Sequence, residues 1–209
     1  MTSSVALPRS AQRSWTGWLP ILAVILIGYL ALASRAPTGL QPHQNNYYSH
    51  LAYAILHGHL DLITTPVGDA DLSVYNGHVY LNWGPAPTLL IMPLVLLFGV
   101  QVSDVVYTAV VGSITPLVLG ASIFELSKRG ILIVSDVKRL LLVLFFAFGT
   151  VQLTLASWGG IWSTAEVFAA FYLSISLYAA LRYANGGAAA WLVGAALAFG
   201  LAAATRLTL

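Results

Sequence analysis

Residues 86–98 read APTLLIMPLVLLF, and the placement of this segment decides the topology of the whole chain. The segment is almost entirely apolar, but it is short and contains two prolines, Pro87 and Pro93. A helix needs roughly 20 apolar residues to cross the hydrocarbon core, whereas runs of roughly 10–14 are more often interfacial or re-entrant. We therefore expect a short helix at the membrane interface, and a sixth membrane span at this position stays open as the alternative.

The basic residues on either side of this segment favour the interfacial placement. The next polar stretch contains four of them, at Lys128, Arg129, Lys138 and Arg139. Two more, Arg9 and Arg13, precede the first apolar stretch. Basic residues gather on the cytoplasmic side of membrane proteins. If residues 86–98 stay at the outer interface, both groups fall on the cytoplasmic side, whereas a span at this position would put the second group outside.

This choice predicts an all-α integral membrane protein that forms a single membrane domain. The five expected spans cover residues 15–34, 104–126, 140–157, 164–183 and 188–206. A cytoplasmic N-terminal tail, residues 1–14, precedes them, and a long extracytoplasmic loop, residues 35–103, follows the first span. The first apolar stretch has a second interpretation as a cleaved signal peptide, because Ala31-Leu32-Ala33 resembles a cleavage site.

The composition of the 209-residue chain agrees with a bilayer setting, in the inner or plasma membrane of a cell. Hydrophobic residues make up 58% and charged residues 8%, whereas soluble domains carry about 25% charged residues. Membrane lipids are therefore the first expected partner, because lipid tolerates an apolar exterior. The net charge of +2 and the lack of a basic patch argue against nucleic acid. Without cysteine, disulfides and thiolate metal sites are excluded.

Within the long loop, residues 46–57 (NYYSHLAYAILH) have the pattern of an amphipathic helix. Apolar residues recur every three to four positions, and polar residues fall on the opposite side. Asn45 or Asn46 can cap the start of this helix, and Gly58 can close its end. We expect the helix to rest on the membrane surface.

The dipeptide NG at residues 76–77 is the strongest short sequence signal for a β-hairpin. A two-residue turn at this dipeptide pairs Val74 with Val79 and Leu72 with Leu81. We therefore expect a small hairpin with one apolar face, docked on the neighbouring helix or on the bilayer.

All five histidines of the chain lie in the same loop, at His43, His50, His57, His59 and His78. Their spacing does not match a zinc site, so no metal is predicted there. The triplet Asp69-Ala70-Asp71 could hold a divalent cation or act as a base, but aspartate is also common in turns. The loop contains one further acid, Asp61, and no other cofactor is expected.

Three stretches together resemble the N-terminal part of a GT-C membrane glycosyltransferase. They are YYSHLAYAILHGHLDL (47–62), VYNGHVYLNWGPAPTLLIMPLVLLFG (74–99) and WSTAEVFAAFYLSISLYAALR (162–182). More narrowly, the chain is similar to the family-39-like group that includes protein mannosyltransferases and the aminoarabinose transferase for lipid A. The resemblance implies transfer of a sugar from a polyprenyl-phosphate donor to an acceptor on the extracytoplasmic face. Complete members have about twice as many spans, so we expect an N-terminal half of such an enzyme or a half-length relative.

The resemblance also implies site residues. Glu166 matches by position a family carboxylate near the start of the fourth span. The residues predicted to be catalytic are Glu166, Asp61, Asp69 and Asp71, and those predicted to bind substrate are Arg206, Tyr47, Tyr48 and Trp83. Structural roles are open to them as well, because a helix N-terminus favours a glutamate and an arginine can snorkel to lipid headgroups.

The chain departs from the family pattern at one position. Members often carry Asp or Glu just before the paired tyrosines, where it acts as general base, but this sequence has Gln44, Asn45 and Asn46 there. An amide cannot act as a base. A non-catalytic accessory subunit of a larger membrane complex is therefore the alternative function, and a transporter is a third.

Overall fold

The structure is a computed structural model that describes residues 15–64 and 70–206. This part of the chain is mostly helical, which confirms the all-α class, and it contains one small hairpin. The helices are η2 (Trp15–Trp18), α1 (Leu19–Ala33), α2 (Tyr47–Leu56), α3 (Thr88–Phe98), α4 (Asp104–Lys128), α5 (Asp136–Gly149), α6 (Val151–Trp158), α7 (Gly160–Ala184) and α8 (Ala190–Ala203). The two strands are β1 (Leu72–Tyr75) and β2 (His78–Leu81).

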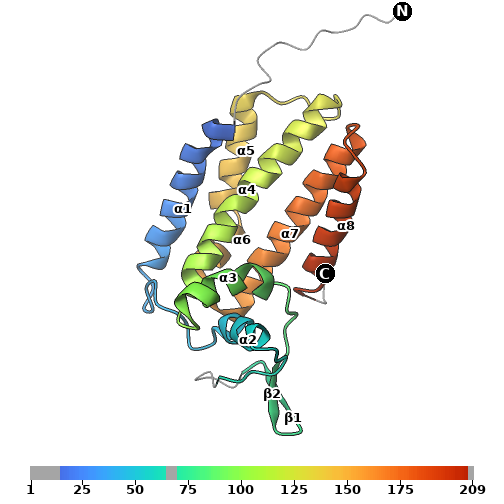
Figure 1. Cartoon of the computed structure of the whole chain (residues 1–209). Coiled ribbons are helices and arrows are strands. Elements are labelled where there is room, and N and C mark those ends of the chain that lie inside the picture. The colour runs from blue at the N-terminus through green and yellow to red at the C-terminus, as the bar shows by residue number, and fades with distance from the viewer. Residues whose placement is uncertain (1–14, 65–69, 207–209) are drawn as a thin grey trace, which may run out of the picture.

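The long helices form one bundle, along which the chain runs in alternating directions (Figure 1). Helix α1 runs toward the end of the bundle where α2, α3 and the hairpin lie, which we call the loop end. Helix α4 returns to the opposite end, which we call the far end, and the α5–α6 pair, α7 and α8 continue the alternation. Segments that lie far apart in the sequence therefore meet at the loop end, among them the start of α7 and the chain after α8.

Two helices, α4 and α7, are long and apolar enough to cross a membrane, with 25 residues each. Helices α5 and α6 pass the same test only together, and they are bent by 56°. The bend corrects the prediction of one continuous span over residues 140–157, because Thr150 is extended and its side chain caps α6 by accepting a hydrogen bond from Gln152 N. Helices α1 and α8 are shorter apolar helices of 15 and 14 residues. The described chain thus has fewer clear spans than the five expected.

Small residues allow the bundle helices to approach one another closely, as the alanine-rich and glycine-rich sequence of α8 predicts. In α8, Ala195 and Ala198 are buried, and the Ala195 carbonyl accepts a hydrogen bond from Ser176 of α7 at 2.9 Å. In α4, Gly112 lies directly against Ala156 of α6.

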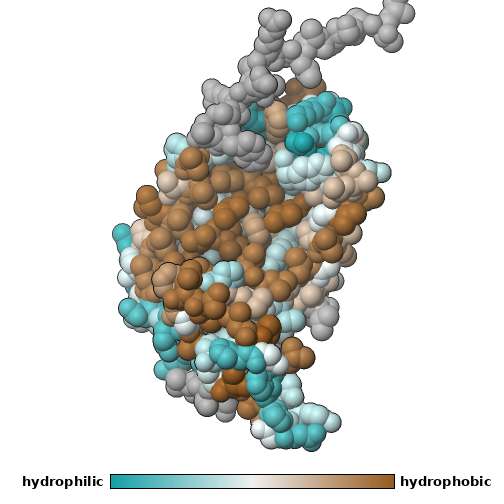
Figure 2. All heavy atoms as spheres, in the orientation of Figure 1, coloured by the Kyte–Doolittle hydropathy of each residue, from teal (hydrophilic) through white to brown (hydrophobic). Residues whose placement is uncertain are grey.

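On the face seen in Figure 2, the hydrophobic surface forms a broad band across the bundle, and hydrophilic residues gather toward its two ends. Helix α3 lies across the bundle at the loop end, with Pro93 inside it (Figure 1). Its length and position match the short helix expected from residues 86–98. Leu96, Leu97 and Phe98 are about 70% exposed, between 68% and 73%, so one side of α3 extends the apolar band.

Helix α2 begins after Asn46 and ends before Gly58, which has a φ of +80°, close to the predicted bounds. The Asn46 side chain does not cap the helix, because it makes no hydrogen bond to the backbone of the first turn. Most of the helix is nevertheless covered by protein, because Tyr47, Tyr48 and Ala52 are at most 1% exposed. We expected a helix resting on the membrane surface, but α2 packs against α3 beneath the bundle (Figure 1).

The hairpin has the predicted register, with Leu72 opposite Leu81 and Val74 opposite Val79. Both turn residues, 76 and 77, have positive φ angles of 50° and 80°, as a two-residue turn of this type requires. Leu72 and Leu81 pack against the core, while Val74 is 73% exposed. Only the base of the predicted apolar face is therefore docked on the rest of the protein.

Candidate functional site

An ion pair joins α7 to the chain after α8 at the loop end. Glu166, in the second turn of α7, binds the guanidinium of Arg206 through Oε1 and Nη1. The side chains of Glu166 and Arg206 are 39% and 31% exposed, so solvent reaches both. An exposed ion pair contributes only about 0–1 kcal/mol to stability, and its partners can therefore be exchanged at little cost.

Two tryptophans lie beside this ion pair. The guanidinium carbon of Arg206 is 5.4 Å from the ring centroid of Trp83. The rings of Trp83 and Trp162 are 6.0 Å apart between centroids, at an angle of 44°. Trp162 lies one helical turn before Glu166 on the same face of α7, and its indole donates a hydrogen bond to Asp71 at 2.7 Å. We call Tyr48, Asp71, Trp83, Trp162, Glu166 and Arg206 the loop-end cluster.

A close backbone contact brings Trp83 and Arg206 together. Gly84 lies so near the carbonyl of Ala204 that a Cβ atom at this position would overlap it. Ala86 N donates a hydrogen bond to the same carbonyl at 3.3 Å. The hydroxyl of Tyr172 in α7 donates a hydrogen bond to the Ala86 carbonyl at 3.1 Å. The segment after β2 is thereby fixed against the end of α8.

Tyr48 contributes a buried polar group to the cluster. Its side chain is 1% exposed, and the structure shows no hydrogen-bond partner for its hydroxyl among the described residues. Burial raises the pKa of this phenol, and the nearby charge of Arg206 opposes that rise. The hydroxyl therefore stays protonated at neutral pH and can donate a hydrogen bond. A buried donor without a partner is costly, so this group is a candidate for contact with a ligand.

Asp71 occupies an unusual backbone conformation beside the hairpin. Its φ angle of +65° is in the left-handed region, which residues other than glycine adopt only occasionally. The Asp71 carbonyl accepts a hydrogen bond from Asn82 N at 3.0 Å, so the residue is held at the base of the two strands. Its carboxylate is directed to Trp162, which makes Asp71 a residue that orients an aromatic ring of the cluster.

The other predicted site residues lie elsewhere. The carboxylate of Asp61 accepts from His78 at 2.7 Å and from His59 at 3.3 Å, away from Glu166. The hydrogen bond from His78 lowers the pKa of Asp61, which makes this carboxylate a weaker base. Tyr47 precedes Tyr48 at the start of α2 and is buried to the same extent, at 0% exposed. Asp69 lies outside the described residues, and the proposed Asp69–Asp71 pair is therefore not described.

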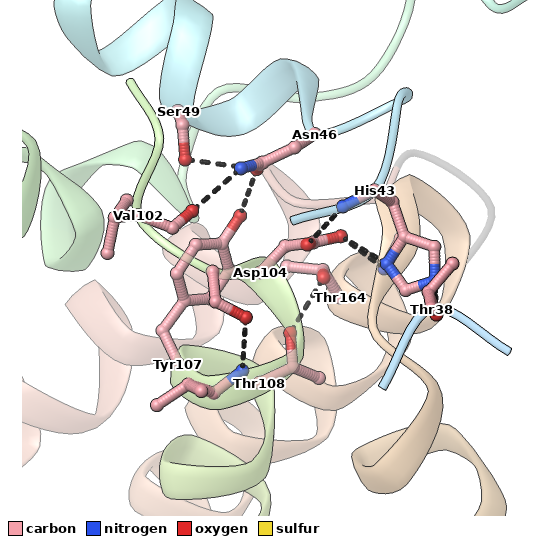
Figure 3. A network of polar contacts seen from close by, with 12 residues as sticks. Thr38, His43, Asn46, Ser49, Val102, Asp104, Tyr107, Thr108 and Thr164 are labelled. Atoms are coloured by element: carbon pink, nitrogen blue, oxygen red, sulfur yellow. Dashed lines mark hydrogen bonds and ion pairs between the residues drawn. The ribbon is translucent and has the colours of Figure 1, made fainter. Parts of the chain in front are cut away.

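A second polar network fixes the loop after α1 to the bundle (Figure 3). Asp104, at the start of α4, is 1% exposed and accepts three hydrogen bonds. His43 donates two of them, from its backbone N at 2.9 Å and its ring Nδ1 at 3.0 Å, and Gly160 N donates the third at 2.6 Å. The bond to Asp104 raises the pKa of His43. Because its oxygens are fully engaged, Asp104 is a structural carboxylate.

Gly159 and Gly160 make this network possible. Both have φ angles above +70°, at +71° and +75°. A Cβ atom on Gly159 would meet the backbone of Val105 at 2.9 Å. The α6–α7 junction can therefore lie directly against the first turn of α4, where Gly160 N reaches the Asp104 carboxylate.

Asn46 stands where the family resemblance places an acid, and it is committed to the same network (Figure 3). Its amide nitrogen donates to the Val102 carbonyl at 2.8 Å. Its amide oxygen accepts from Tyr107 at 2.7 Å and from Ser49 at 3.0 Å. The side chain is 4% exposed and joins α2 to α4. The amide at this position is thus a packing element.

An ionic cluster also lies at the far end, where Glu125 of α4 is 2% exposed. Its carboxylate accepts from Lys128 at 2.8 Å and from Asn185 at 2.6 Å, and it lies 3.6 Å from Arg182. The Glu125–Lys128 ion pair lies within α4, and Arg182 and Asn185 connect it to the end of α7. We call these four residues the far-end cluster.

Two residues of functional interest were missed in the sequence. Trp162 was not among the predicted site residues, although its spacing of four from Glu166 puts both on one helical face. Asp104 follows the capping residue Ser103, and an acid in the first turn of a membrane helix was the available signal.

Within the described residues, no group of three or more histidine, aspartate or glutamate side chains is arranged to hold a metal ion. The divalent cation considered for the Asp69–Asp71 pair stays a prediction. No protein-family model, curated protein or solved structure matches the chain.

Proposed function

We propose that the chain is a membrane protein of the GT-C type that transfers a sugar from a polyprenyl-phosphate donor at its loop end. One observation carries the proposal. A carboxylate, Glu166, and a guanidinium, Arg206, meet beside two tryptophans, although these residues come from separate segments of the sequence. A general base, an anion-binding cation and aromatic rings are the groups that such a transfer needs at one place.

Arg206 takes the phosphate of the donor. A guanidinium binds phosphate through two parallel hydrogen bonds, and this interaction can replace an exposed carboxylate partner. The buried hydroxyl of Tyr48 donates a further hydrogen bond to the same phosphate. The rings of Trp83 and Trp162 flank the sugar, and Asp71 orients the ring of Trp162 by accepting its indole hydrogen bond.

Glu166 is the general base of the proposed reaction. When the donor phosphate occupies Arg206, the carboxylate is released and accepts the proton of the acceptor hydroxyl. The acceptor oxygen forms a bond to the anomeric carbon as the bond between that carbon and the phosphate oxygen breaks. Polyprenyl phosphate leaves with the electron pair and stays opposite Arg206.

A donor-dependent transferase assay tests this role. We expect Glu166→Gln to lower the rate about 10²–10⁴-fold, which is the usual contribution of a general base. Asp136→Asn is the matched control, because it also removes an arginine-paired carboxylate, at the far end. Unchanged transfer by Glu166→Gln would remove Glu166 from the mechanism.

The topology that supports this function has five passes, with the N-terminus in the cytoplasm and the loop end outside. Helix α1 with η2, α4, the bent α5–α6 pair, α7 and α8 provide the passes. Reporter fusions between residues 128 and 139 test the orientation. A reporter that is active outside the cell would contradict it.

The hydrogen bonds of Asn46 favour a second candidate function, a non-catalytic accessory subunit. A GT-C-like scaffold whose first-loop acid is replaced by a packing amide could act through protein contacts alone. Purification in fixed stoichiometry with other membrane proteins, together with unchanged complex activity in Glu166→Gln, would support this alternative. Donor-dependent transfer that requires Glu166 would exclude it.

A further inference from the structure

Apolar side chains are exposed on the far-end loop, residues 129–135, which joins α4 to α5. Ile133 is 92% exposed and Ile131 is 64% exposed. Val137, in the first turn of α5, is 66% exposed. Apolar side chains in this position are unfavourable in water. Their grouping indicates an interaction surface.

Basic residues flank this apolar group in the sequence and on the adjoining end of α7, and the neighbouring acids are paired with some of them. The basic residues are Lys128, Arg129, Lys138, Arg139 and Arg182. Glu125 is bound within the far-end cluster, and Asp136 accepts a hydrogen bond from Arg139 at 2.7 Å. The charge that this surface presents to its surroundings is therefore positive.

Two arginines at this end lie over tryptophan rings. Arg139 lies 5.6 Å from the ring centroid of Trp18, and Arg182 lies 5.0 Å from that of Trp191. Arginine and tryptophan are typical of the level at which lipid headgroups meet the hydrocarbon core. These pairs place the far-end loop beside headgroups, which favours lipid over a soluble protein as the partner.

We propose that the far-end loop is a binding site for anionic phospholipid headgroups, with Ile131, Ile133 and Val137 inserted between the lipids. Apolar insertion combined with basic flanks is the chemistry by which proteins bind a negatively charged leaflet. The hydrophobic band of the bundle leads toward this end, where hydrophilic residues gather (Figure 2). The site depends on the membrane setting proposed above and does not depend on sugar transfer.

The absence of cysteine from the chain allows a direct test. An environment-sensitive fluorophore is attached to the cysteine of Ile133→Cys in the full chain. The labelled protein is reconstituted in nanodiscs of phosphatidylcholine, either alone or mixed with phosphatidylglycerol. Tyr75→Cys, at the exposed hairpin tip, is the control position, because its side chain is 68% exposed at the opposite end. Brominated acyl chains report contact with lipid by quenching the probe.

We expect the probe at residue 133 to be quenched, with stronger quenching when phosphatidylglycerol is present. The difference in quenching between the two lipid compositions should be lost in the triple variant Lys128→Gln, Arg129→Gln and Lys138→Gln. It should also be lost at about 1 M salt, where the Debye length is about 3 Å. The probe at residue 75 should respond to neither lipid. If Ile133→Cys does not fold, the same probe at Ile131→Cys serves for the measurement.

Three results would overturn the proposal. The probe at residue 133 could stay accessible to water in both lipids, or its quenching could be equal with and without phosphatidylglycerol. It could also be shielded only after addition of a membrane extract, which would make a protein the partner. Because transferase activity is not measured, failure here is distinct from failure of the proposed reaction.

Discussion

The chain has two glutamates, Glu125 and Glu166, and both bind an arginine at an end of the same bundle. Glu125 has a side chain that is 3% exposed, and its oxygens are occupied by Lys128 and Asn185. The side chain of Glu166 is 39% exposed and lies beside tryptophan rings. The difference in burial and in the number of partners separates a carboxylate that holds two helices together from one that can exchange its partner. The residue types alone do not make this distinction.

The largest effect is expected from Gly84→Ala, which should disturb the surroundings of Glu166 and leave those of Glu125 unchanged. Its Cβ atom would overlap the Ala204 carbonyl, a backbone atom that cannot rotate away. We expect a loss of about 2–3 kcal/mol in unfolding free energy, typical of overpacking, and loss of donor binding as Trp83 moves from Arg206. Thermal unfolding in detergent measures the stability, and titration with the polyprenyl-phosphate-linked sugar measures donor binding.

The control for this variant is Gly194→Ala in α8, where a Cβ atom meets nothing within 4 Å. Alanine is favoured over glycine in a helix by roughly 0.5–1 kcal/mol, so we expect unchanged or raised stability. If Gly84→Ala is as stable and binds as well as the control, the close backbone contact does not position the cluster.

Removal of each glutamate side chain tests the comparison directly. We expect Glu125→Ala to cost about 1–3 kcal/mol, because Asn185 and Lys128 lose a buried acceptor. Glu166→Ala should change stability by less than about 0.5 kcal/mol, as is usual for a solvent-exposed position. Equal costs in a parallel unfolding experiment would contradict the assignment of structural and functional roles.

The parts of the fold that local chemistry determines could be predicted from the sequence. The hairpin register followed from the Asn76-Gly77 turn, and the C-terminal end of α2 followed from Gly58, whereas Asn46 precedes α2 without capping it. The bend between α5 and α6 was not predicted, because the apolar composition continues without a proline across Thr150. Its cause is the extended backbone of Thr150, which a hydropathy pattern does not reveal.

The site could be predicted as separate residues but not as an arrangement. Glu166, Arg206, Trp83 and Asp71 were each chosen for their chemistry, and they meet in the structure. Asp61 was chosen on the same grounds, but its partners are two histidines of the segment between α1 and α3. The tertiary pairing that adds Trp162 depends on contacts between distant segments.

A smaller effect is expected from Glu166→Gln on binding of polyprenyl phosphate without a sugar. In the proposed mechanism the Glu166 carboxylate competes with the phosphate for Arg206. Its removal should therefore tighten binding by about two- to fivefold, because an exposed ion pair contributes up to about 1 kcal/mol. Isothermal titration in nanodiscs measures the affinity, and Asp136→Asn should leave it unchanged. Weaker binding by Glu166→Gln would show that the carboxylate supports the phosphate site.

The smallest expected effect concerns pH and the His43–Asp104 contact, which holds the loop after α1 to α4. The hydrogen bond to Asp104 raises the pKa of His43, so the protonated ring is favoured in the folded state. The stability that this gives is fully present below the ordinary pKa of histidine, which is about 6.5. It is lost as the pH rises through the raised pKa.

His50 behaves in the opposite way, because burial lowers its pKa. Its contribution is present above the ordinary histidine pKa and is lost as the pH falls through the lowered value. We therefore expect His43→Gln to remove the decline in melting temperature on the alkaline side and to leave the decline on the acidic side. Because the far-end cluster contains no histidine, Lys128→Gln should leave the decline on the alkaline side unchanged. A wild-type melting temperature that does not fall as the pH rises above about 6.5 would show that His43 contributes no charge to this contact.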